Sequence, residues 1–244
     1  MEDKIVYEVI RVIDGKPLFL ENHLDRMKSS FKIINEKFEL SYDEINNKIK
    51  KVIETENIMN GNIKLTYGIK EKVLNVFFIE HSYPSDEMYE KGVKTILYFG
   101  ERENPNAKII NENFREKVTN EIRKNNCYEA ILVDRNGYIT EGSKSNIFMI
   151  KDGVLLTSPV KAVLPGITRG EVIKVAKQCG IETKEVEYKY SEISELDGMF
   201  ICGTSPKILP INQVGHIKLN EKNKIIRTLM DGYNSEIIKY LVMY

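Results

Sequence analysis

The sequence predicts an α+β fold of two domains, a small N-terminal α/β sandwich and a larger, β-rich C-terminal domain with helices. Three observations support this prediction. The first half mixes strand-like runs with amphipathic helices, and the second half contains several short strands joined by Asn-Gly and Asp-Gly turns. Between them lies Glu101–Ala107, a polar segment that contains a proline. The predicted boundaries are 1–101, a linker at 102–107, and 108–244.

The first domain is predicted to open with a hairpin. Ile5–Ile13 is apolar and rich in β-branched residues, and Asp14-Gly15 can turn the chain back into Pro17–Leu20. A helix then begins at Glu21 or Asn22, because an apolar stripe follows at helical spacing. That stripe consists of Leu24, Met27, Phe31 and Ile34.

A second helix begins at Ser41, where Glu44 completes a capping box. Its apolar face is Ile45, Ile49, Val52 and Ile53. The remaining elements of this domain are predicted to be strands: a second hairpin and one further strand. Their ranges are Asn62–Ile69, Val73–Ile79 and Gly92–Phe99.

The second domain begins with a helix whose apolar face is Phe114, Val118 and Ile122. The turns Asn136-Gly137 and Asp152-Gly153 separate short strands, and two helices and a buried strand follow. The predicted strands are Tyr128–Asp134, Tyr138–Thr140, Ser145–Ile150, Val154–Thr157 and Met199–Cys202, and the predicted helices are Arg169–Cys179 and Ile225–Tyr244.

Composition excludes several classes of function. Hydrophobic residues make up 42% and charged residues 30%, as in globular proteins, and 36 basic residues balance 36 acidic ones. We therefore expect no nucleic-acid or membrane partner. No apolar run is long enough to span a membrane, the N-terminus lacks a signal-peptide layout, and Cys127, Cys179 and Cys202 are expected to be buried free thiols, so a cytoplasmic location is predicted. No residues have metal-ligand spacing.

Glu141 is the first candidate site residue. It ends a hairpin strand within Thr140–Phe148, and Gly142, Ser143, Ser145 and Asn146 follow as groups that could hold its carboxylate. A carboxylate opposite a pyridine nitrogen keeps that nitrogen protonated, so that the ring accepts electrons. The alternative is a solvated turn carboxylate, the usual fate of a single glutamate.

Gly166-Ile167-Thr168 is the second candidate, within Leu164–Arg169. This segment ends a loop and opens a helix, where free backbone N–H groups and the helix dipole can hold a phosphate. The alternative is an ordinary helix cap, a role that suits threonine. An acid and a phosphate site close together in sequence indicate a phosphorylated ring cofactor, pyridoxal 5′-phosphate.

Gly203-Thr204-Ser205-Pro206 is the third candidate, directly after the predicted strand Met199–Cys202. Small hydroxyl residues at a strand end can bind an anion. The alternative is a structural turn, because turns of this composition are common.

Together these segments resemble the class IV aminotransferase family, which comprises branched-chain aminotransferases, D-amino acid aminotransferases and aminodeoxychorismate lyase. The resemblance runs along nearly the whole chain. It implies a pyridoxal-phosphate enzyme of the D-amino acid aminotransferase-like fold, called fold type IV, with the cofactor in the C-terminal domain. The matching segments are Val6–Val9, Leu24–Arg26, Ala107–Asn111, Tyr128–Leu132, Thr140–Phe148, Leu164–Arg169 and Phe200–Pro210.

The resemblance implies a role for individual residues. Lys108 falls on the lysine that forms the Schiff base and moves the substrate Cα proton, in a crevice between the domains. Glu141 falls on the partner of the pyridine nitrogen, and Arg26 on a phosphate-binding arginine. The remaining cofactor contacts fall on Gly166, Ile167, Thr168, Thr204 and Ser205, and the substrate contacts on Tyr7, Thr204 and Ser205. Each charged residue has a simpler alternative, since Lys108 and Arg26 could be solvated cations.

The sequence departs from the family pattern at three places. It begins almost at the strand that bears Tyr7, so the family's first strands and a pocket-closing loop are missing. Tyr67 stands where the D-amino acid enzymes carry an arginine for the substrate carboxylate. Asn113 replaces a tyrosine that, in branched-chain enzymes, bonds the phenolic oxygen of the cofactor.

The resemblance therefore implies an aminotransferase that exchanges an amino group between an amino acid and a 2-oxo acid, as a homodimer. Two alternatives stand beside it. One is a lyase that releases pyruvate from aminodeoxychorismate, although Tyr7-Glu8 is more similar to the transaminase pattern. The other is a non-catalytic homologue that has lost activity with its shortened N-terminus.

Overall fold

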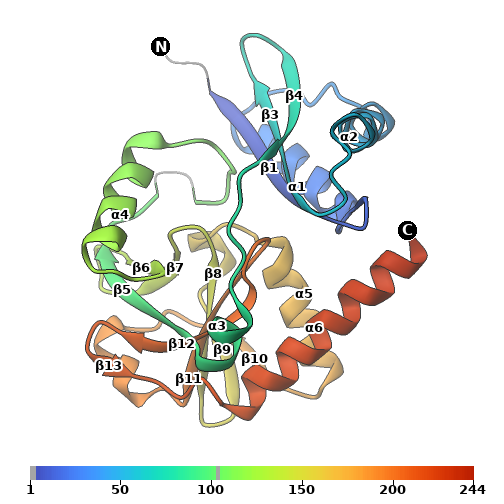
Figure 1. The fold of residues 1–244 in the computed structure, drawn as a ribbon. Helices are drawn as coiled ribbons and strands as arrows, with labels where there is room; N and C mark the ends of the chain where they lie inside the picture. The colour runs from blue at the N-terminus through green and yellow to red at the C-terminus, as the bar shows by residue number, and fades with distance from the viewer. Residues whose placement is uncertain (1–3, 103–104) are drawn as a thin grey trace. The chain divides into compact units, whose positions relative to one another are not determined.

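The computed structural model describes residues 4–102 and 105–244, and the chain divides into two compact units (Figure 1). Unit 1 comprises the chain up to Ser82 together with Asn106–Ile110 and Ile237–Tyr244, and unit 2 comprises Tyr83–Pro105 and Asn111–Glu236. These units differ from the predicted boundaries. Val93–Phe99 pairs with strands of unit 2, whereas Asn106–Ile110 joins unit 1 through backbone hydrogen bonds.

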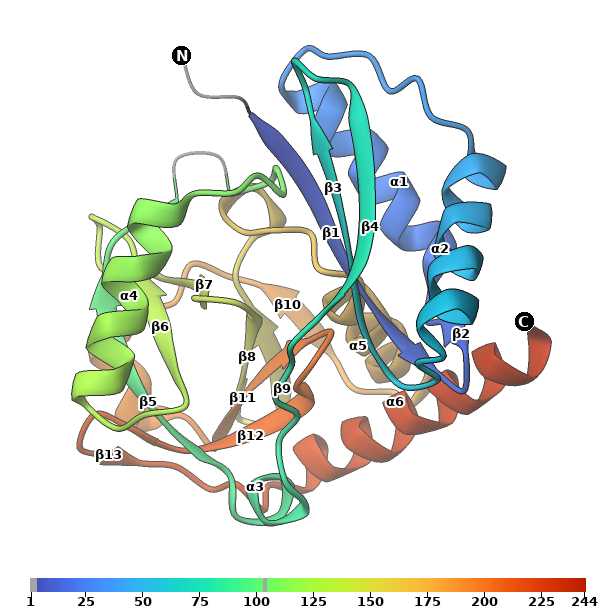
Figure 2. The same ribbon diagram turned by 45° about the horizontal axis from the view of Figure 1, so that its top comes forward.

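Unit 1 is a four-stranded sheet covered on one side by two helices (Figure 2). The strand order is β2-β1-β3-β4, and every pair is antiparallel. One buried cluster contains the apolar faces of α1 and α2 together with every second residue of the strands. This agrees with the period of 3.6 residues in a helix and of two in a strand. The elements are β1 (Ile5–Ile13), β2 (Lys16–Pro17), α1 (Leu20–Ile33), α2 (Tyr42–Glu56), β3 (Gly61–Gly68) and β4 (Val73–Ile79).

The N-terminus of α1 is bonded by a residue near the C-terminal end of the chain. Its N-cap, Phe19, has left-handed backbone angles and no capping side chain. Instead the Leu20 N–H donates to the Tyr240 hydroxyl at 3.0 Å, and the Phe19 and Tyr240 rings lie 4.9 Å apart. Because Tyr240 supplies the missing acceptor, the helix begins before the predicted Glu21 or Asn22.

Unit 2 is built on a nine-stranded mixed sheet. Its strand order is β10-β9-β8-β11-β12-β5-β6-β7, with β13 paired to β12. The strands are β5 (Val93–Phe99), β6 (Glu129–Val133), β7 (Ile139–Gly142), β8 (Asn146–Lys151), β9 (Val154–Thr157), β10 (Thr183–Glu185), β11 (Gly198–Gly203), β12 (Lys207–Val214) and β13 (Ile217–Lys218). The helices are α3 (Asp86–Lys91), α4 (Glu112–Lys124), α5 (Ile167–Gln178) and α6 (Lys224–Met243), of which the last continues into unit 1. Two short 3₁₀ turns occupy Val160–Ala162 and Tyr190–Glu195.

The strand β12 was not predicted, because Pro210 lies inside it. Proline lacks the N–H that a central strand needs on one of its sides. In the structure Pro210 pairs with Phe200 of β11, and pairing with β5 starts only at Ile211. Pro210 therefore lies before the first residue of β12 that pairs with β5, so its missing N–H costs no hydrogen bond to β5.

The cysteine prediction holds only in part. Cys127, Cys179 and Cys202 are free thiols, but only Cys202 is buried. Cys179 is exposed because it is the C-cap of α5, at the end of the helix that leaves the core. Among the described residues no helix is long and apolar enough to cross a membrane.

The predicted capping box is present at α2. The Glu44 N–H donates to the Ser41 hydroxyl at 3.2 Å, and the Ser41 N–H donates to the Glu44 carboxylate at 2.8 Å. Ser41→Ala removes one side of this exchange, so we expect a loss of about 1 kcal/mol in the free energy of unfolding. Urea denaturation measures it. Ser235→Ala is the control, because this exposed serine only bonds a carbonyl within its own helix, and an equal loss in both variants would contradict the role of the cap.

Candidate active site

The segment that carries Lys108 lies along the free edge of β1. Val6 and Ile109 form an isolated antiparallel bridge, the Tyr7 N–H donates to the Lys108 carbonyl at 3.0 Å, and the Ile110 N–H donates to the Ile5 carbonyl at 3.2 Å. On its other side the Lys108 N–H donates to the hydroxyl of buried Ser30 at 3.2 Å. The backbone of Lys108 is therefore fixed between a strand and a helix of unit 1.

The Lys108 side chain is half-buried and lies over the Tyr7 ring. Its Nζ is 4.8 Å from the ring centroid, within the range of a cation–π contact. Tyr7 itself is only 3% exposed. The alternative of a fully solvated surface lysine is therefore wrong for Lys108, while its Schiff-base role stays a prediction.

Arg26 is buried in an ion pair that sequence reasoning missed. Its Nε donates to Glu8 Oε1 at 2.8 Å and its Nη2 to Glu8 Oε2 at 2.6 Å, the side-by-side geometry in which arginine binds a carboxylate most strongly. His23 Nδ1 lies 2.8 Å from the same carboxylate. The alternative of a solvated Arg26 is therefore wrong, because its guanidinium is packed between α1 and β1.

The charges of this cluster follow from its burial. Burial raises the pKa of the Glu8 carboxyl, but the charge and hydrogen bonds of Arg26, together with His23, outweigh it and lower the pKa from 4.5 to about 2. Burial lowers the pKa of His23 below 6.5, even though Glu8 acts in the opposite direction. At neutral pH Glu8 is therefore ionised and His23 is neutral.

In unit 2, β7 runs two residues past the predicted end at Thr140, so Glu141 lies within the strand, and it is buried rather than solvated. Its carboxylate accepts from the Leu164 N–H at 2.9 Å and from Arg102 Nη1 at 3.1 Å. The Glu141 side chain is 5% exposed and that of Arg102 is 21% exposed. The carboxylate is thus held by a backbone donor from the loop that leads to α5.

The polar residues after Glu141 donate hydrogen bonds to a second carboxylate, that of Glu129. Glu129 Oε1 accepts from the Lys144 N–H at 2.6 Å, from Ser145 Oγ at 3.0 Å and from Ser143 Oγ at 3.4 Å. Ser143 and Ser145 were expected to hold Glu141, so that prediction is corrected: their hydroxyl groups bond Glu129. Burial raises the pKa of Glu129, and these donors oppose that rise.

The same turn requires a glycine at position 142. A Cβ there would lie 2.6 Å from Glu129 Oε1 and would also collide with the Ser145 hydroxyl. Glu129, in the neighbouring strand β6, therefore determines how closely the turn after Glu141 packs.

The helix α5 begins at Ile167, two residues before the predicted start, and its N-cap is Gly166. No side chain caps this end, so Thr168 is not the N-cap and instead lies buried in the first turn. Any side chain at position 166 would collide with the Asn146 amide oxygen. The first N–H groups of α5 are thus a suitable place for a phosphate.

Thr204 and Ser205 are half-buried in the turn between β11 and β12. Asn146 connects the strand that leads into this turn to the loop that leads into α5. Asn146 pairs with Cys202 in the sheet, and its side-chain amide donates to the Leu164 carbonyl at 2.9 Å. Within unit 2 the structure therefore brings three predicted segments to one region: Glu141, Gly166–Thr168 and Thr204–Ser205.

The predicted residues thus form two groups. Tyr7, Arg26 and Lys108 belong to unit 1, and Glu141, Gly166, Ile167, Thr168, Thr204 and Ser205 belong to unit 2. Asn113 is exposed in the first turn of α4. The prediction missed Glu8, Ser30, Arg102 and Glu129; an acidic residue at an inward position of a strand was the available signal for Glu8 and Glu129.

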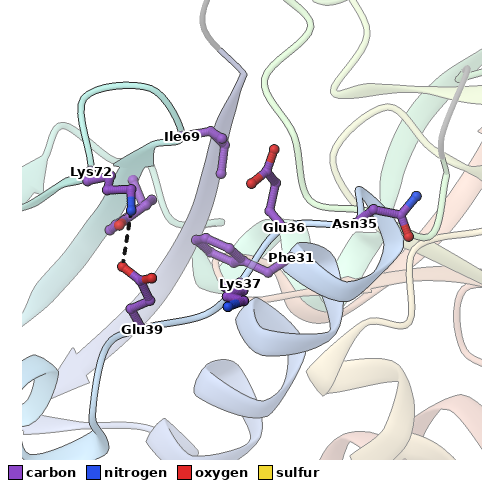
Figure 3. Close-up of a pocket in the computed structure, with 8 residues that line it drawn as sticks. Phe31, Asn35, Glu36, Lys37, Glu39, Ile69 and Lys72 are labelled. Carbon is purple, nitrogen blue, oxygen red and sulfur yellow. Dashed lines mark hydrogen bonds and ion pairs between the residues drawn. The ribbon is translucent and has the colours of Figure 1, made fainter.

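A separate pocket of about 310 Å³ lies in unit 1 (Figure 3). Its lining includes Phe31 and Tyr67, whose rings pack edge to face at 5.1 Å, and the Lys72–Glu39 ion pair at 3.4 Å. None of the predicted site residues lines it. Among the described residues no His, Cys, Asp and Glu cluster could hold a metal ion.

The buried Glu8–Arg26 pair predicts a pH-dependent stability. Glu8→Gln leaves the Arg26 charge buried without a partner, so we expect a loss of about 3 kcal/mol in the free energy of unfolding at pH 7. Because the folded pKa lies below the unfolded one, the contribution of Glu8 is complete above pH 4.5 and is lost as pH falls towards about 2. Urea denaturation at several pH values should show the two proteins converging in that range.

Glu54→Gln is the matched control for this experiment, because Glu54 is an exposed residue of α2. It should follow the wild-type pH profile. A Glu8→Gln protein as stable as the wild type at pH 7 would show that the pair contributes nothing.

Comparison with known proteins identifies the family. The model of the amino-transferase class IV family matches residues 5–214. The chain is 32% identical to the branched-chain-amino-acid aminotransferase of Escherichia coli K12, over 88% of this chain and 78% of that protein. It is 31% identical to the D-alanine aminotransferase of Listeria monocytogenes, over 88% of this chain and 79% of that protein.

The fold agrees. A crystal structure of the Escherichia coli branched-chain amino acid aminotransferase superimposes with a TM-score of 0.85, at 27% identity, over 96% of this chain and 86% of that one. Family model, relatives and fold therefore give one answer: this chain belongs to the class IV aminotransferases, and its fold is fold type IV.

Proposed function

We propose that this protein is a pyridoxal-phosphate-dependent aminotransferase that exchanges the amino group between an amino acid and a 2-oxo acid. The observation that carries the proposal is the buried carboxylate of Glu141 in the same unit as the uncapped N-terminus of α5. Such an arrangement has a place for a cationic ring nitrogen and a place for a phosphate.

The residues fit the group that the family uses. The Glu141 carboxylate is buried and already bonded by Leu164, so it is fixed before a ligand arrives. The N–H groups of Ile167 and Thr168 and the side chains of Thr204 and Ser205 supply donors for phosphate oxygens, and Gly166 lets the backbone approach closely. When bound, pyridoxal phosphate supplies an aldehyde that reacts with amines and a ring that accepts electrons.

The protein groups would then act as follows. Lys108 would be the residue that holds the aldehyde end of the cofactor, and its Nζ would be the base that takes the proton from the substrate Cα. The Glu141 carboxylate would hold the ring nitrogen and favour its protonated form. Arg26 contributes a positive charge for the phosphate, and Glu8 fixes the direction of its guanidinium.

Two further parts of the proposal come from the family resemblance. We propose that the protein is a homodimer and that it works in the cytoplasm. The names of the relatives suggest branched-chain amino acids or D-alanine as substrates. A screen of L- and D-amino acids with 2-oxoglutarate decides between them.

The proposal predicts that Lys108→Ala cannot bind the cofactor covalently. After incubation with pyridoxal phosphate and reduction with borohydride, the intact wild-type protein should gain the mass of one cofactor, and the variant should not. Transamination should fall to background in the variant. Lys177→Ala, at an exposed position of α5, is the control and should behave as the wild type does.

An unlabelled and inactive wild type would overturn the aminotransferase proposal in favour of a binding protein. A labelled wild type that is inert to every amino acid, yet releases pyruvate from aminodeoxychorismate, would identify the lyase instead.

Glu141→Gln separates charge from packing. Glutamine keeps an oxygen for the Leu164 N–H, so the fold should persist, but a neutral amide cannot stabilise a protonated ring nitrogen. We expect kcat to fall by about 10²–10³-fold, which corresponds to about 2.7–4 kcal/mol. Glu116→Gln, on an exposed position of α4, is the control, and an unchanged kcat in Glu141→Gln would remove Glu141 from the mechanism.

A further inference from the structure

The C-terminal helix α6 contacts the first turn of α5 and the strand that follows the Thr204–Ser205 turn. The Tyr233 hydroxyl lies 3.4 Å from Thr168 Oγ1, in the first turn of α5. The next residue of α6, Asn234, accepts a hydrogen bond from Lys207 Nζ at 3.1 Å, and Lys207 is the first residue of β12. Both segments that are predicted to hold the phosphate therefore adjoin one supporting helix.

Close packing of α6 against α5 fixes the position of Tyr233. Tyr233 is 2% exposed and Thr168 is 5% exposed. One residue before Tyr233, a Cβ at Gly232 would lie 2.4 Å from the Cγ1 atom of Val175 in α5. The glycine thus lets the two helices approach closely, and the tyrosine hydroxyl is held next to Thr168 as a consequence.

The two hydroxyl groups can share a hydrogen bond in either direction, because each has one hydrogen to donate and lone pairs that accept. In the part of the chain that the structure describes, Tyr233 is the one hydrogen-bond partner of Thr168 Oγ1. If Thr168 donates to Tyr233, it has no hydrogen left for another acceptor. If Tyr233 donates, the Thr168 hydrogen remains available. Phosphate oxygens are acceptors, so a phosphate can bond the Thr168 hydroxyl only in the second arrangement.

We propose that Tyr233 is a positioning residue of the phosphate site, which donates to Thr168 Oγ1 so that the Thr168 hydroxyl donates to a phosphate oxygen. This inference rests on the proposed function, in which the N-terminus of α5 holds the cofactor phosphate. Hydrogen bonds in such a buried chain polarise and strengthen one another. Because Tyr233 acts through Thr168, its hydroxyl affects the binding of a phosphorylated ligand and has no effect on the same ligand without phosphate.

The test compares pyridoxamine 5′-phosphate with pyridoxamine, which differ only in the phosphate and have no aldehyde to react with Lys108. The full chain is freed of bound cofactor, and calorimetric titration gives the ratio of the Kd of pyridoxamine to that of pyridoxamine 5′-phosphate. Tyr233→Phe removes the hydroxyl and keeps the ring, so this ratio should fall about 3–10-fold from the wild-type value, as expected for the loss of one hydrogen bond. The Kd of pyridoxamine should not change.

Tyr190→Phe is the matched control. Tyr190 is a half-buried tyrosine of unit 2 whose ring packs edge to face against Phe99 at 5.1 Å, and its hydroxyl has no hydrogen bond within the described residues. The ratio in this variant should equal that of the wild type.

A double-mutant cycle shows whether Tyr233 acts through Thr168. Thr168→Val removes the intermediate hydroxyl, so the ratio should fall in this variant, and the addition of Tyr233→Phe should lower it no further. Thr168→Ser keeps a hydroxyl and should keep the full effect of Tyr233→Phe. Circular dichroism checks that each variant is folded, and Thr168→Ala replaces Thr168→Val if the latter is not.

A wild type that prefers the phosphorylated ligand, together with an unchanged ratio in Tyr233→Phe, would overturn this inference and leave the proposed function intact. An equal loss of affinity for both ligands would also overturn it, because Tyr233 would then act through the fold alone. So would an undiminished effect of Tyr233→Phe in the Thr168→Val background. A wild type that binds both ligands equally would instead contradict the phosphate site on which the proposed function rests.

Discussion

The attachment of Asn106–Ile110 to the edge of β1 is the constraint on which the chemistry of unit 1 depends. Two backbone hydrogen bonds join this segment to Ile5 and Tyr7, and Ser30 binds the Lys108 N–H from α1. With its backbone fixed on both sides, Lys108 can move only about its own side-chain torsions. Its amine lies over the Tyr7 ring, and such prior positioning would favour the proton transfer that we propose for Lys108.

Strand alternation sorts the charges of unit 1 into two environments. Glu8 projects towards the helices, where it is buried and bonded to Arg26. Tyr7, its neighbour in sequence, projects to the other face, where Lys64 and Lys108 approach its ring. A single residue step along β1 thus separates the buried pair of Glu8 and Arg26 from the face on which two lysines approach the Tyr7 ring.

Unit 2 contains two buried carboxylates on adjacent strands that serve different purposes. Glu129 of β6 receives its hydrogen bonds from the turn after Glu141, and the shape of that turn depends on it and on Gly142. Glu141 of β7 instead bonds to Leu164 in the loop before α5 and to Arg102. Glu141 is therefore connected to the loop that ends at the N-terminus of α5, so the carboxylate and the helix end are positioned together.

The sequence by itself determined the local features: the capping box of Ser41 and Glu44, the first strand Ile5–Ile13, and the glycine-containing turns, because each depends on residues close together in the chain. It also predicted the end of the strand β7 and the start of the helix α5 to within two residues. Only the tertiary structure decided that Pro210 lies inside a strand, that Tyr240 caps α1, that Arg26 is buried against Glu8, and that the serines after Glu141 bond Glu129. The physical reason is that a buried polar group takes whichever partner the fold brings near, and a distant partner leaves no periodic signal in the sequence.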